Sequence, residues 1–363
     1  METFSDSRPE HPAAAQPMFS FLSPAYRTEK TLSRTIDSVR AQTRSDWELV
    51  VVDNGNSDAI AAVVGAYLSD PRIRLIRQEN KGPIGGTMAA SAAAHGRYLV
   101  VLNSDDSVTP DFCVRTGQIL DARPDIAAVT CDAHLFTDPD GSRLSRSYLE
   151  TAGARDRLDR IDGSRPLRLA DVIDGPCPYY SAPIRRDVWD AMGGLATDTP
   201  IVGDLDFWLR TLSAGYDVRM ISDRLGVYRI DAGSVSRPVD PMRSEVFEEQ
   251  RERALSRAAL RSGDPADIAA LERVLRRLRY QQAIRRARVA IQKGSVEEAR
   301  RQCRGAFAQR TTLRAGAILV ILRVAPSALV RIHPVKQRVQ KRLQRRVRQL
   351  RRISLRRSPA GLT

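Results

Sequence analysis

One stretch decides the fold of this chain: Arg97-Tyr98-Leu99-Val100-Val101-Leu102-Asn103-Ser104-Asp105-Asp106. The apolar run led by Tyr98 predicts a buried strand of a parallel sheet. The run ends abruptly in Asn-Ser-Asp-Asp, and open α/β sheets bind their ligands beyond the carboxyl ends of the strands. Asparagine and carboxylate oxygens are hard ligands that suit Mg²⁺ or Mn²⁺ carried in with a phosphorylated substrate. Taken alone, Asn103–Asp106 is better explained as an Asx-type turn after a strand.

Strands and helices alternate on both sides of this stretch. The predicted strands are apolar runs that end at polar or turn-forming residues: Met18–Ser23, stopped by Pro24, then Trp47–Val52, Ile73–Ile76 and Ile126–Cys131. The predicted helices are amphipathic or rich in alanine: Thr31–Gln42, Ala59–Tyr67, Ile84–Ala94 and Phe112–Ala122. This alternation predicts a parallel α/β sheet covered by helices.

The pattern is less regular after Asp106. We expect Leu135–Pro166 to be mostly irregular and Tyr179–Ala182 to form a strand. Two predicted helices end next to glycines, which suit helix C-termini: Arg186–Met192 and Asp204–Ala214. Tyr216–Arg229 predicts two short extended segments.

The composition changes near Val235, and few strand-forming residues follow. Pro241–Arg310 predicts helices with breaks near Ser262–Pro265 and at Gly294, the latter inside a helical hairpin. Two more helices are predicted beyond it, an apolar one with an internal proline and an Arg-rich amphipathic one: Leu313–Ile332 and Val335–Arg357.

Charge is distributed very unevenly along the chain. Residues 1–240 hold 27 Lys and Arg against 34 Asp and Glu, a net charge of −7, whereas residues 241–363 hold 31 against 9, a net charge of +22. An acidic domain is therefore joined to a strongly basic region. The basic region suits anionic lipid, nucleic acid or an acidic partner.

Cysteine and histidine usage argues against two classes of protein. The four cysteines and four histidines are scattered, with no Cys-x-x-Cys pair. A zinc site and a disulfide framework are therefore not expected, and a reduced, cytosolic setting is favoured. Residues 1–17 have the composition of a loose tail rather than a signal peptide, and no uncharged apolar run is long enough to span a membrane.

Four motifs follow one another in the order Leu22-Ser23-Pro24-Ala25-Tyr26, Val50-Val51-Val52-Asp53-Asn54-Gly55, Leu102-Asn103-Ser104-Asp105-Asp106 and Gly203-Asp204-Leu205-Asp206-Phe207-Trp208-Leu209-Arg210. Together they resemble the family 2 glycosyltransferases over roughly Met18–Ser236. The resemblance implies an α/β fold of the GT-A (Rossmann-like) type, with a mostly parallel sheet sandwiched by helices, followed here by a basic all-α C-terminal region. We therefore expect a disordered tail (1–17), a catalytic domain (18–236), a helical region (237–310) and basic amphipathic helices (311–363).

The resemblance also implies an activity, the transfer of a sugar from a nucleotide-sugar donor to an acceptor hydroxyl. Asp204 stands where the family has its general base, which takes the acceptor's proton during an in-line attack that inverts the anomeric configuration. Asp105, together with Asn103, stands at the Asp-x-Asp position that holds Mg²⁺ or Mn²⁺ on the donor diphosphate. The residues expected to bind the donor are Pro24, Ala25, Tyr26, Asp53, Asn54, Asn80, Gly82, Asn103, Ser104 and Arg229. We expect Asp53, Asp105 and Asp204 to converge on a single cavity.

Three departures from the family pattern keep a second hypothesis open. Asn103 replaces the first Asp, Gly203 replaces the Glu before the base, and Thr87 stands where relatives often have Arg. A catalytically impaired sugar-nucleotide binder is the alternative, and Asp204 would then be only the N-cap of its helix. Ala254 follows Gln250–Arg253 where processive relatives have Trp, so addition of one sugar or a few is favoured.

The basic helices allow two interpretations of equal weight. They either lie on an anionic membrane surface near a lipid-linked acceptor, or pack their apolar side on the catalytic domain. Nucleic-acid binding through the Arg-rich tail is the hypothesis from another class, but no aromatic residue follows Phe307 to stack on bases. We expect a glycan or lipid-linked acceptor in a polysaccharide or cell-envelope pathway, and a cytoplasmic protein peripheral to the inner face of the cell membrane.

Overall fold

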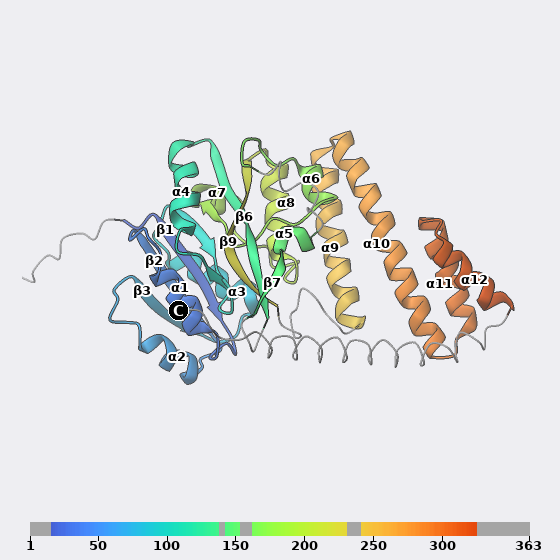
Figure 1. The fold of residues 1–363 in the computed structure, drawn as a ribbon, viewed down its shortest axis with the longest axis horizontal. Coiled ribbons are helices and arrows are strands. Elements are labelled where there is room, and N and C mark those ends of the chain that lie inside the picture. The colour runs from blue at the N-terminus through green and yellow to red at the C-terminus, as the bar shows by residue number, and fades with distance from the viewer. Residues whose placement is uncertain (1–15, 138–141, 153–161, 231–240, 325–363) are drawn as a thin grey trace, which may run out of the picture. The chain divides into compact units, whose positions relative to one another are not determined.

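The computed structural model describes residues 16–137, 142–152, 162–230 and 241–324 (Figure 1). The chain divides into two compact units, Met1–Leu271 and Glu272–Thr363. The first unit holds a mixed sheet with helices on its faces, and the second holds helices only.

The first half of the sheet is parallel. Its strands pair in the order β3-β2-β1-β4, with these bounds: β3 Ile73–Gln78, β2 Trp47–Asn54, β1 Phe19–Ala25 and β4 Tyr98–Val101. Nearly every residue of β1, β2 and β4 is buried, as a parallel sheet covered on both faces requires. The parallel α/β prediction is confirmed for this half.

The second half of the sheet is mixed. From β4 the order continues β8-β6-β9-β5, and β7 pairs with the free side of β6. The bounds are β8 Pro183–Arg185, β6 Ile126–Thr137, β9 Asp217–Ile230, β5 Ser107–Val108 and β7 Ser142–Ser147. β8 is antiparallel to both β4 and β6, whereas β6 and β9 are parallel.

Eight helices are described between the strands, and they match most of the predicted ones within a few residues. They are α1 Leu32–Arg40, α2 Asp58–Gly65, α3 Gly82–Ala93, α4 Phe112–Ala122, α5 Tyr148–Thr151, α6 Leu169–Ile173, α7 Arg186–Ala191 and α8 Gly203–Ser213. The core between sheet and helices contains large side chains, among them Phe19, Phe21, Trp47 and Tyr98. Each such side chain contributes about 1.5–3 kcal/mol through burial.

Four local predictions were wrong. β1 continues through Pro24 to Ala25, because pairing with β4 ends at Leu22 and Val101 and no partner needs the missing N–H. Most of the described residues of Leu135–Pro166 lie in regular elements, since β6 runs to Thr137 and β7 and α5 follow. The strand expected at Tyr179–Ala182 lies at Pro183–Arg185 instead. Tyr216–Arg229 forms the single long strand β9, which bulges where it follows β6.

A buried carboxylate explains why β6 continues beyond its apolar run. Asp132 is almost fully buried, and its Oδ1 accepts the backbone N–H groups of Ala133 at 2.8 Å and Leu149 at 2.9 Å. A buried charge is tolerated where such donors satisfy it. The strand therefore passes through a residue that looks like a strand end in the sequence.

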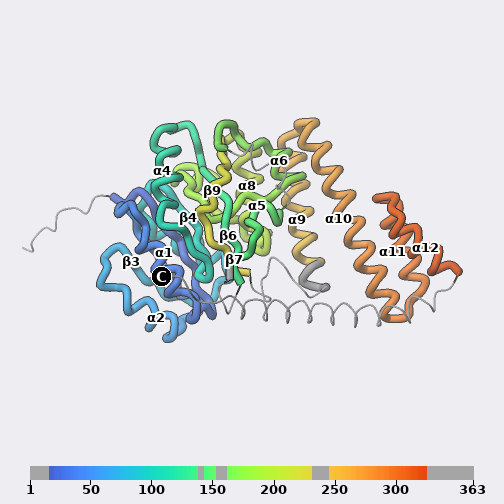
Figure 2. The backbone as a smooth tube through the Cα atoms, viewed as in Figure 1, coloured from blue at the N-terminus to red at the C-terminus, as the bar shows by residue number. Residues whose placement is uncertain are grey.

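Four long helices follow the sheet (Figure 2): α9 Pro241–Ser262, α10 Pro265–Gln292, α11 Val296–Gln309 and α12 Leu313–Val324. α9 belongs to the first unit and packs on α6 and α8. The predicted breaks are confirmed: Gly263 and Gly294 have φ of +66° and +74°, a backbone conformation that glycine adopts readily.

Within the described ranges, no helix is long and apolar enough to cross a membrane. The predicted helix Val335–Arg357 and residues 325–332 of the preceding one lie outside the described residues, as does the expected tail at residues 1–15.

Candidate active site

The carboxyl ends of three parallel strands meet at one edge of the sheet. β1 and β2 pair so that Ala25 lies beside Asp53, and β1 and β4 pair so that Leu22 lies beside Val101. The polar residues that follow each strand therefore emerge next to one another, as expected for a ligand site of an open α/β sheet.

Hydrogen bonds from α1 and β1 fix the turn after β4. The Ser104 hydroxyl donates to the Pro24 carbonyl at 2.9 Å, and the Thr31 hydroxyl donates to the Ser104 carbonyl at 3.0 Å. Thr35 donates in the same way to the Asp106 carbonyl at 2.7 Å. Ser104 thus holds the turn to β1, and the side chains of Asn103, Asp105 and Asp106 line the neighbouring cavity.

Asp53 is a buried carboxylate of which one oxygen is hydrogen-bonded. Its side chain is 0% exposed, and Oδ2 accepts a hydrogen bond from Arg77 Nε at 3.1 Å. The same guanidinium binds the exposed carboxylate of Asp58 at 2.9 Å. Asp53 Oδ1 has no hydrogen-bond partner in the described part of the chain. A buried acceptor of this kind is costly unless a ligand supplies the donor.

Tyr26 lies at the same edge with its ring 44% exposed. Gly55 packs against this ring so closely that a Cβ there would lie 3.0 Å from Tyr26 Cδ2. The guanidinium of Arg27 lies over the ring at 5.1 Å from its centroid, and Arg27 has a left-handed backbone with φ of +56°. A base that stacks on the open face of Tyr26 has to displace Arg27.

Asn54 connects β2 to the start of α3. Its amide nitrogen donates to the Gly82 carbonyl at 2.8 Å and to Asn80 at 3.3 Å, and its oxygen accepts from Gln78 at 2.8 Å. Asn80 in turn accepts from the Gly82 N–H at 2.8 Å. The structure therefore shows Asn54, Asn80 and Gly82 bound to one another, so they shape the edge of the site.

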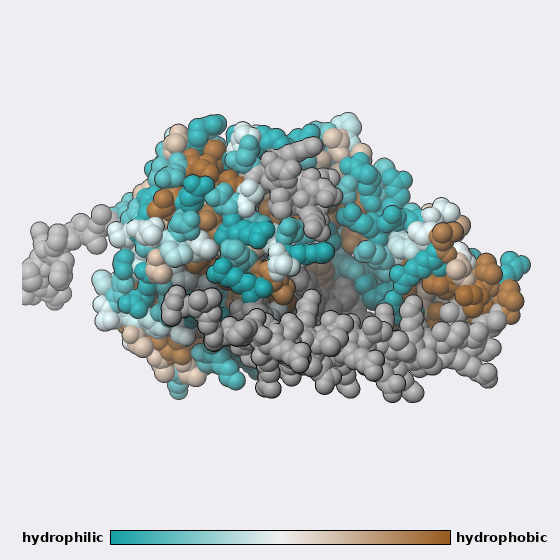
Figure 3. Space-filling view, viewed as in Figure 1, coloured by the Kyte–Doolittle hydropathy of each residue, from teal (hydrophilic) through white to brown (hydrophobic). Residues whose placement is uncertain are grey.

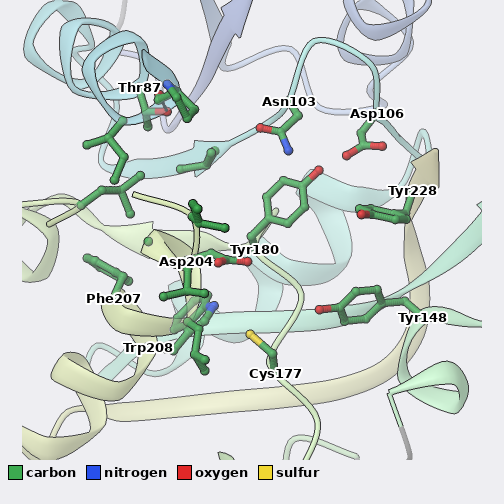
Figure 4. Close-up of a pocket in the computed structure, with 18 of the residues that line it drawn as sticks. Thr87, Asn103, Asp106, Tyr148, Cys177, Tyr180, Asp204, Phe207, Trp208 and Tyr228 are labelled. Atoms are coloured by element: carbon green, nitrogen blue, oxygen red, sulfur yellow. Dashed lines mark hydrogen bonds between the residues drawn. The ribbon is translucent and has the colours of Figure 1, made fainter. Parts of the chain in front are cut away.

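A cavity of about 700 Å³ lies beside this edge within the first unit (Figure 4). Its lining comes from parts of the sequence far apart: the turn after β4, the segment before β8, α5, α8, the end of β9 and α9. Asn103, Asp105, Asp204 and Arg229 all line it. Asp53 does not, so the expected convergence of three carboxylates holds for Asp105 and Asp204 only.

Asp204 lies in the first turn of α8, which begins at Gly203 after the N-cap Val202. Burial raises the pKa of Asp204, while backbone N–H groups of the helix start, including that of Leu205, lower it. Asp204 is therefore not the N-cap. Gly203 packs against Ile84 of α3, and a Cβ there would lie 2.9 Å from Ile84 Cδ1. That contact favours a small residue at this position.

Asp105 and Arg229 form an ion pair at the cavity wall, with 3.1 Å between Oδ2 and Nη1. Next to it, Asp106 Oδ1 accepts the backbone N–H of Arg229 at 2.6 Å, which ties the turn after β4 to β9. Burial and the neighbouring charge of Asp105 raise the pKa of Asp106 well above its usual value. Asp106 therefore links the turn after β4 to β9 and also lines the cavity.

These residues fit a divalent cation that is shared with a substrate. Among the described residues, no three Asp, Glu, His or Cys side chains gather to hold a metal ion. Asp105 and Asn103 offer one carboxylate and one amide oxygen at the cavity. Mg²⁺ is commonly held in this way, by one or two carboxylates together with substrate phosphates.

Sequence reasoning missed the aromatic part of the cavity lining. Tyr148, Tyr180 and Tyr228 all line the cavity, and the ring centroid of Tyr228 lies 5.9 Å from that of Tyr148 and 6.5 Å from that of Tyr180. Phe247 and Arg251 of α9, one helical turn apart, also line the cavity. The only signals in the sequence were the adjacent tyrosines after Gly-Pro-Cys-Pro and the i, i+4 spacing on α9.

Comparisons with known proteins agree with this architecture. The structure is similar to that of TarS 1–349 from S. aureus in complex with UDP-GlcNAc (TM-score 0.57, 16% identity, 86% of this chain and 89% of that chain). It is also similar to the mannosyltransferase PcManGT from Pyrobaculum calidifontis in complex with GDP-Man and Mn²⁺ (TM-score 0.55, 17% identity, 88% and 87% of the two chains). These likenesses confirm the predicted GT-A fold.

Sequence similarity narrows the class to a family. Residues 20–190 match glycosyl transferase family 2. Over 107 residues the chain is 43% identical to the succinoglycan biosynthesis protein ExoO of Rhizobium meliloti, a match that covers 29% of this chain and 30% of ExoO. This chain thus spans less than a third of that relative. Residues 20–190 thus carry the similarity to glycosyl transferase family 2 that the first three motifs predicted.

Proposed function

We propose that this protein is an inverting, non-processive glycosyltransferase that uses a nucleotide-sugar donor. One observation carries the proposal: a single cavity gathers Asn103, Asp105 and Arg229 with the partly buried carboxylate of Asp204, beside the strand edge that holds Asp53 and Tyr26. The cavity offers polar groups for a diphosphate at one wall and a base for an acceptor at another.

The residues divide the reaction between them. The acceptor hydroxyl oxygen forms the new bond to the anomeric carbon, the bond from that carbon to the diphosphate breaks, and the proton passes to a carboxylate oxygen of Asp204. Attack from the face opposite the diphosphate inverts the anomeric configuration. Arg229 places a positive charge at the cavity wall, where it stabilises the charge that develops on the departing diphosphate.

We propose that Asp105 and Asn103 hold Mg²⁺ or Mn²⁺ together with the donor. When bound, the ion supplies further positive charge to the diphosphate. The Asp105–Arg229 ion pair keeps both side chains at the same wall, and Asp106 fixes that wall by its bond to the Arg229 backbone.

The donor's base would occupy the strand edge. Asp53 Oδ1 supplies an unused acceptor for a base N–H group, and Arg77 holds the other oxygen, so the carboxylate is fixed in orientation. The ring of Tyr26 supplies a stacking surface once Arg27 moves away. Because every base offers an N–H group or an aromatic face, this arrangement favours a nucleotide without selecting one base.

The acceptor side suits a glycan. Tyr148, Tyr180 and Phe247 give the cavity lining an aromatic surface on which sugar rings pack, and the chain resembles a protein of succinoglycan biosynthesis. We propose a polysaccharide or lipid-linked glycan acceptor. The four cysteines are unbonded and suit the reducing cytoplasm, where we place the enzyme.

A thermal-shift screen of UDP, GDP, dTDP and their sugars, with and without Mn²⁺, tests the proposal. Stabilisation by one nucleotide, increased by the metal, is the expected result, because a ligand that binds only the folded state raises its stability. The matching nucleotide sugar should then be consumed in the presence of glycan acceptors, with a product of inverted configuration by NMR. Failure of every nucleotide to bind would refute the proposal.

The catalytically impaired binder remains the second candidate, since Gly203 and Asn103 replace acidic residues of the family pattern. Binding of a nucleotide sugar without transfer or hydrolysis at any pH would favour it. Turnover that depends on Asp204 would exclude it.

A further inference from the structure

Helix α12 is apolar around nearly its whole circumference. One face packs inside the second unit: Ala315, Ile318, Leu319 and Leu322 contact buried residues of α10 and α11. A helix that is hydrophobic on all sides is normally buried on all sides. The other face of α12 therefore needs a partner that the described residues do not supply.

That other face is exposed. Leu313, Val320 and Val324 are 96%, 61% and 78% exposed, and Ala317 is exposed between them. Their spacing of i, i+4, i+7 and i+11 places all four on one side of the helix. Of the ten large hydrophobic side chains that are exposed in the described ranges, five lie between Phe307 and Val324. Figure 3 shows an apolar surface over α12.

Arginines border this apolar face. By helical spacing Arg314 lies on one side of the exposed strip and Arg323 on the other, and both are exposed. Residues 272–324 hold 14 Lys and Arg against three Asp and Glu. A partner for this surface has to be apolar at its centre and negatively charged around it.

Charge decides between the occupants. Residues 325–363 hold 12 Lys and Arg and no acidic residue, so they are repelled by the arginines of α12, as is the same unit of a second copy. Nucleic acid has the negative charge that suits the arginines, but it would leave the exposed valines and leucine in contact with water. An anionic bilayer suits both the arginines and the apolar face, because its headgroups attract arginine while its interface accepts an apolar helix face.

We propose that α12 docks this protein on an anionic lipid surface, with Leu313, Ala317, Val320 and Val324 inserted at the interface and Arg314 and Arg323 among the headgroups. The surface is separate from the cavity of the first unit and does not depend on the proposed activity. Docking in this way would keep the enzyme beside a lipid-linked acceptor.

Vesicle flotation of the full chain tests the proposal. The protein should float with phosphatidylcholine vesicles that contain 30% phosphatidylglycerol and not with phosphatidylcholine alone. Val320→Ser combined with Val324→Ser keeps the charge and removes apolar area, and should weaken binding by about tenfold or more. Leu260→Ser is the matched control, since Leu260 is 70% exposed but lies in the first unit.

The outcomes separate the alternatives. Binding that depends on phosphatidylglycerol and on the two valines supports the proposal, provided that circular dichroism shows both variants folded. Three results would overturn it: no flotation with anionic vesicles, equal flotation of the valine variant, or a dimer in light scattering that the valine variant abolishes. Tight binding to DNA that the valine substitutions leave unchanged, without flotation, would assign the basic unit to nucleic acid.

Discussion

Asp204 combines two opposing influences in one carboxyl group. Burial favours its neutral form, and the amides at the start of α8 favour its charged form; the pKa is raised on balance. A base with a raised pKa accepts a proton more readily at neutral pH than an ordinary aspartate does. We therefore expect kcat/KM to rise with pH through an acidic limb that lies above the usual value of 3.8.

Asp204→Asn should separate activity from stability. Loss of the base should lower kcat by about 10²–10⁴-fold and remove the acidic limb. A carboxyl whose pKa is raised by folding destabilises the folded state once it ionises, so the variant should melt above the wild type at pH 7. The difference should shrink as the pH falls toward the unfolded value.

Differential scanning calorimetry across pH and steady-state rates measure both effects. Asp190→Asn, on an exposed residue of α7, is the control for the change in charge. Unchanged activity in Asp204→Asn would remove this residue from the mechanism.

Asp53→Asn should weaken nucleotide binding, because the amide presents at most one acceptor and loses the charge that holds Arg77. A hydrogen bond to a charged group contributes about 1.5–3 kcal/mol, so affinity should fall by about 10–100-fold. Calorimetric titration with the nucleotide that stabilises the wild type gives the measurement.

Asp58→Asn is the matched control for that substitution. It makes the same change in charge on the other carboxylate that binds Arg77, and its side chain is 96% exposed. Equal losses of affinity in the two variants would show that Arg77, rather than Asp53 Oδ1, governs the site.

At the level of secondary structure, the sequence predicted helices better than the second half of the sheet. Apolar spacing and terminal glycines located α4, α8 and the breaks around α10 within a few residues. β9 was divided into two segments, and β6 was cut short because a buried charge such as Asp132 looks like a strand end until the backbone donors that satisfy it are known.

The same limit applies to the site. The part of the site at the carboxyl ends of the strands was predictable, because parallel strands bring Asp53 and Asn103 to one edge of the sheet whatever their distance in sequence. Tyr148, Tyr180 and Arg251 were not, because their place in the cavity depends on how α5, the segment before β8 and α9 pack. That packing is set by long-range contacts, which no local pattern reports.

One buried carboxylate, that of Asp206, forms ion pairs that join α8 to α9. Asp206 binds Arg210 of its own helix at 2.7 Å and Arg257 of α9 at 2.6 Å, and Arg257 also reaches Asp198 at 2.7 Å. Arg257→Ala should lower the free energy of unfolding by about 1–3 kcal/mol, less than for a fully buried pair because Arg257 is partly exposed. Urea unfolding gives the value.

Asp198→Ala removes only the exposed partner of Arg257 and should cost less than about 1 kcal/mol. If both variants lost the same stability, the buried bridge would not be what holds α9 to α8. If neither lost any, apolar packing of Ala254, Leu255 and Ala258 would suffice for this contact.

For the whole molecule, two units with separate cores predict two unfolding transitions. The helical unit has small cores built around residues such as Ala287, Ile291 and Cys303, whereas the first unit has one large core. A nucleotide that binds the first unit should raise only that unit's transition. A single calorimetric transition that the nucleotide shifts as a whole would show that the two units do not unfold independently.

The place of β6 has a consequence for how the chain is made on the ribosome. β1, β2, β3 and β4 all lie before residue 102, so half of the sheet is able to form early in synthesis. β6 lies between β8 and β9, and the last of these ends only at Ile230. Until then β6 lacks the strand that pairs along most of its length, and an apolar strand with an open edge is prone to aggregation.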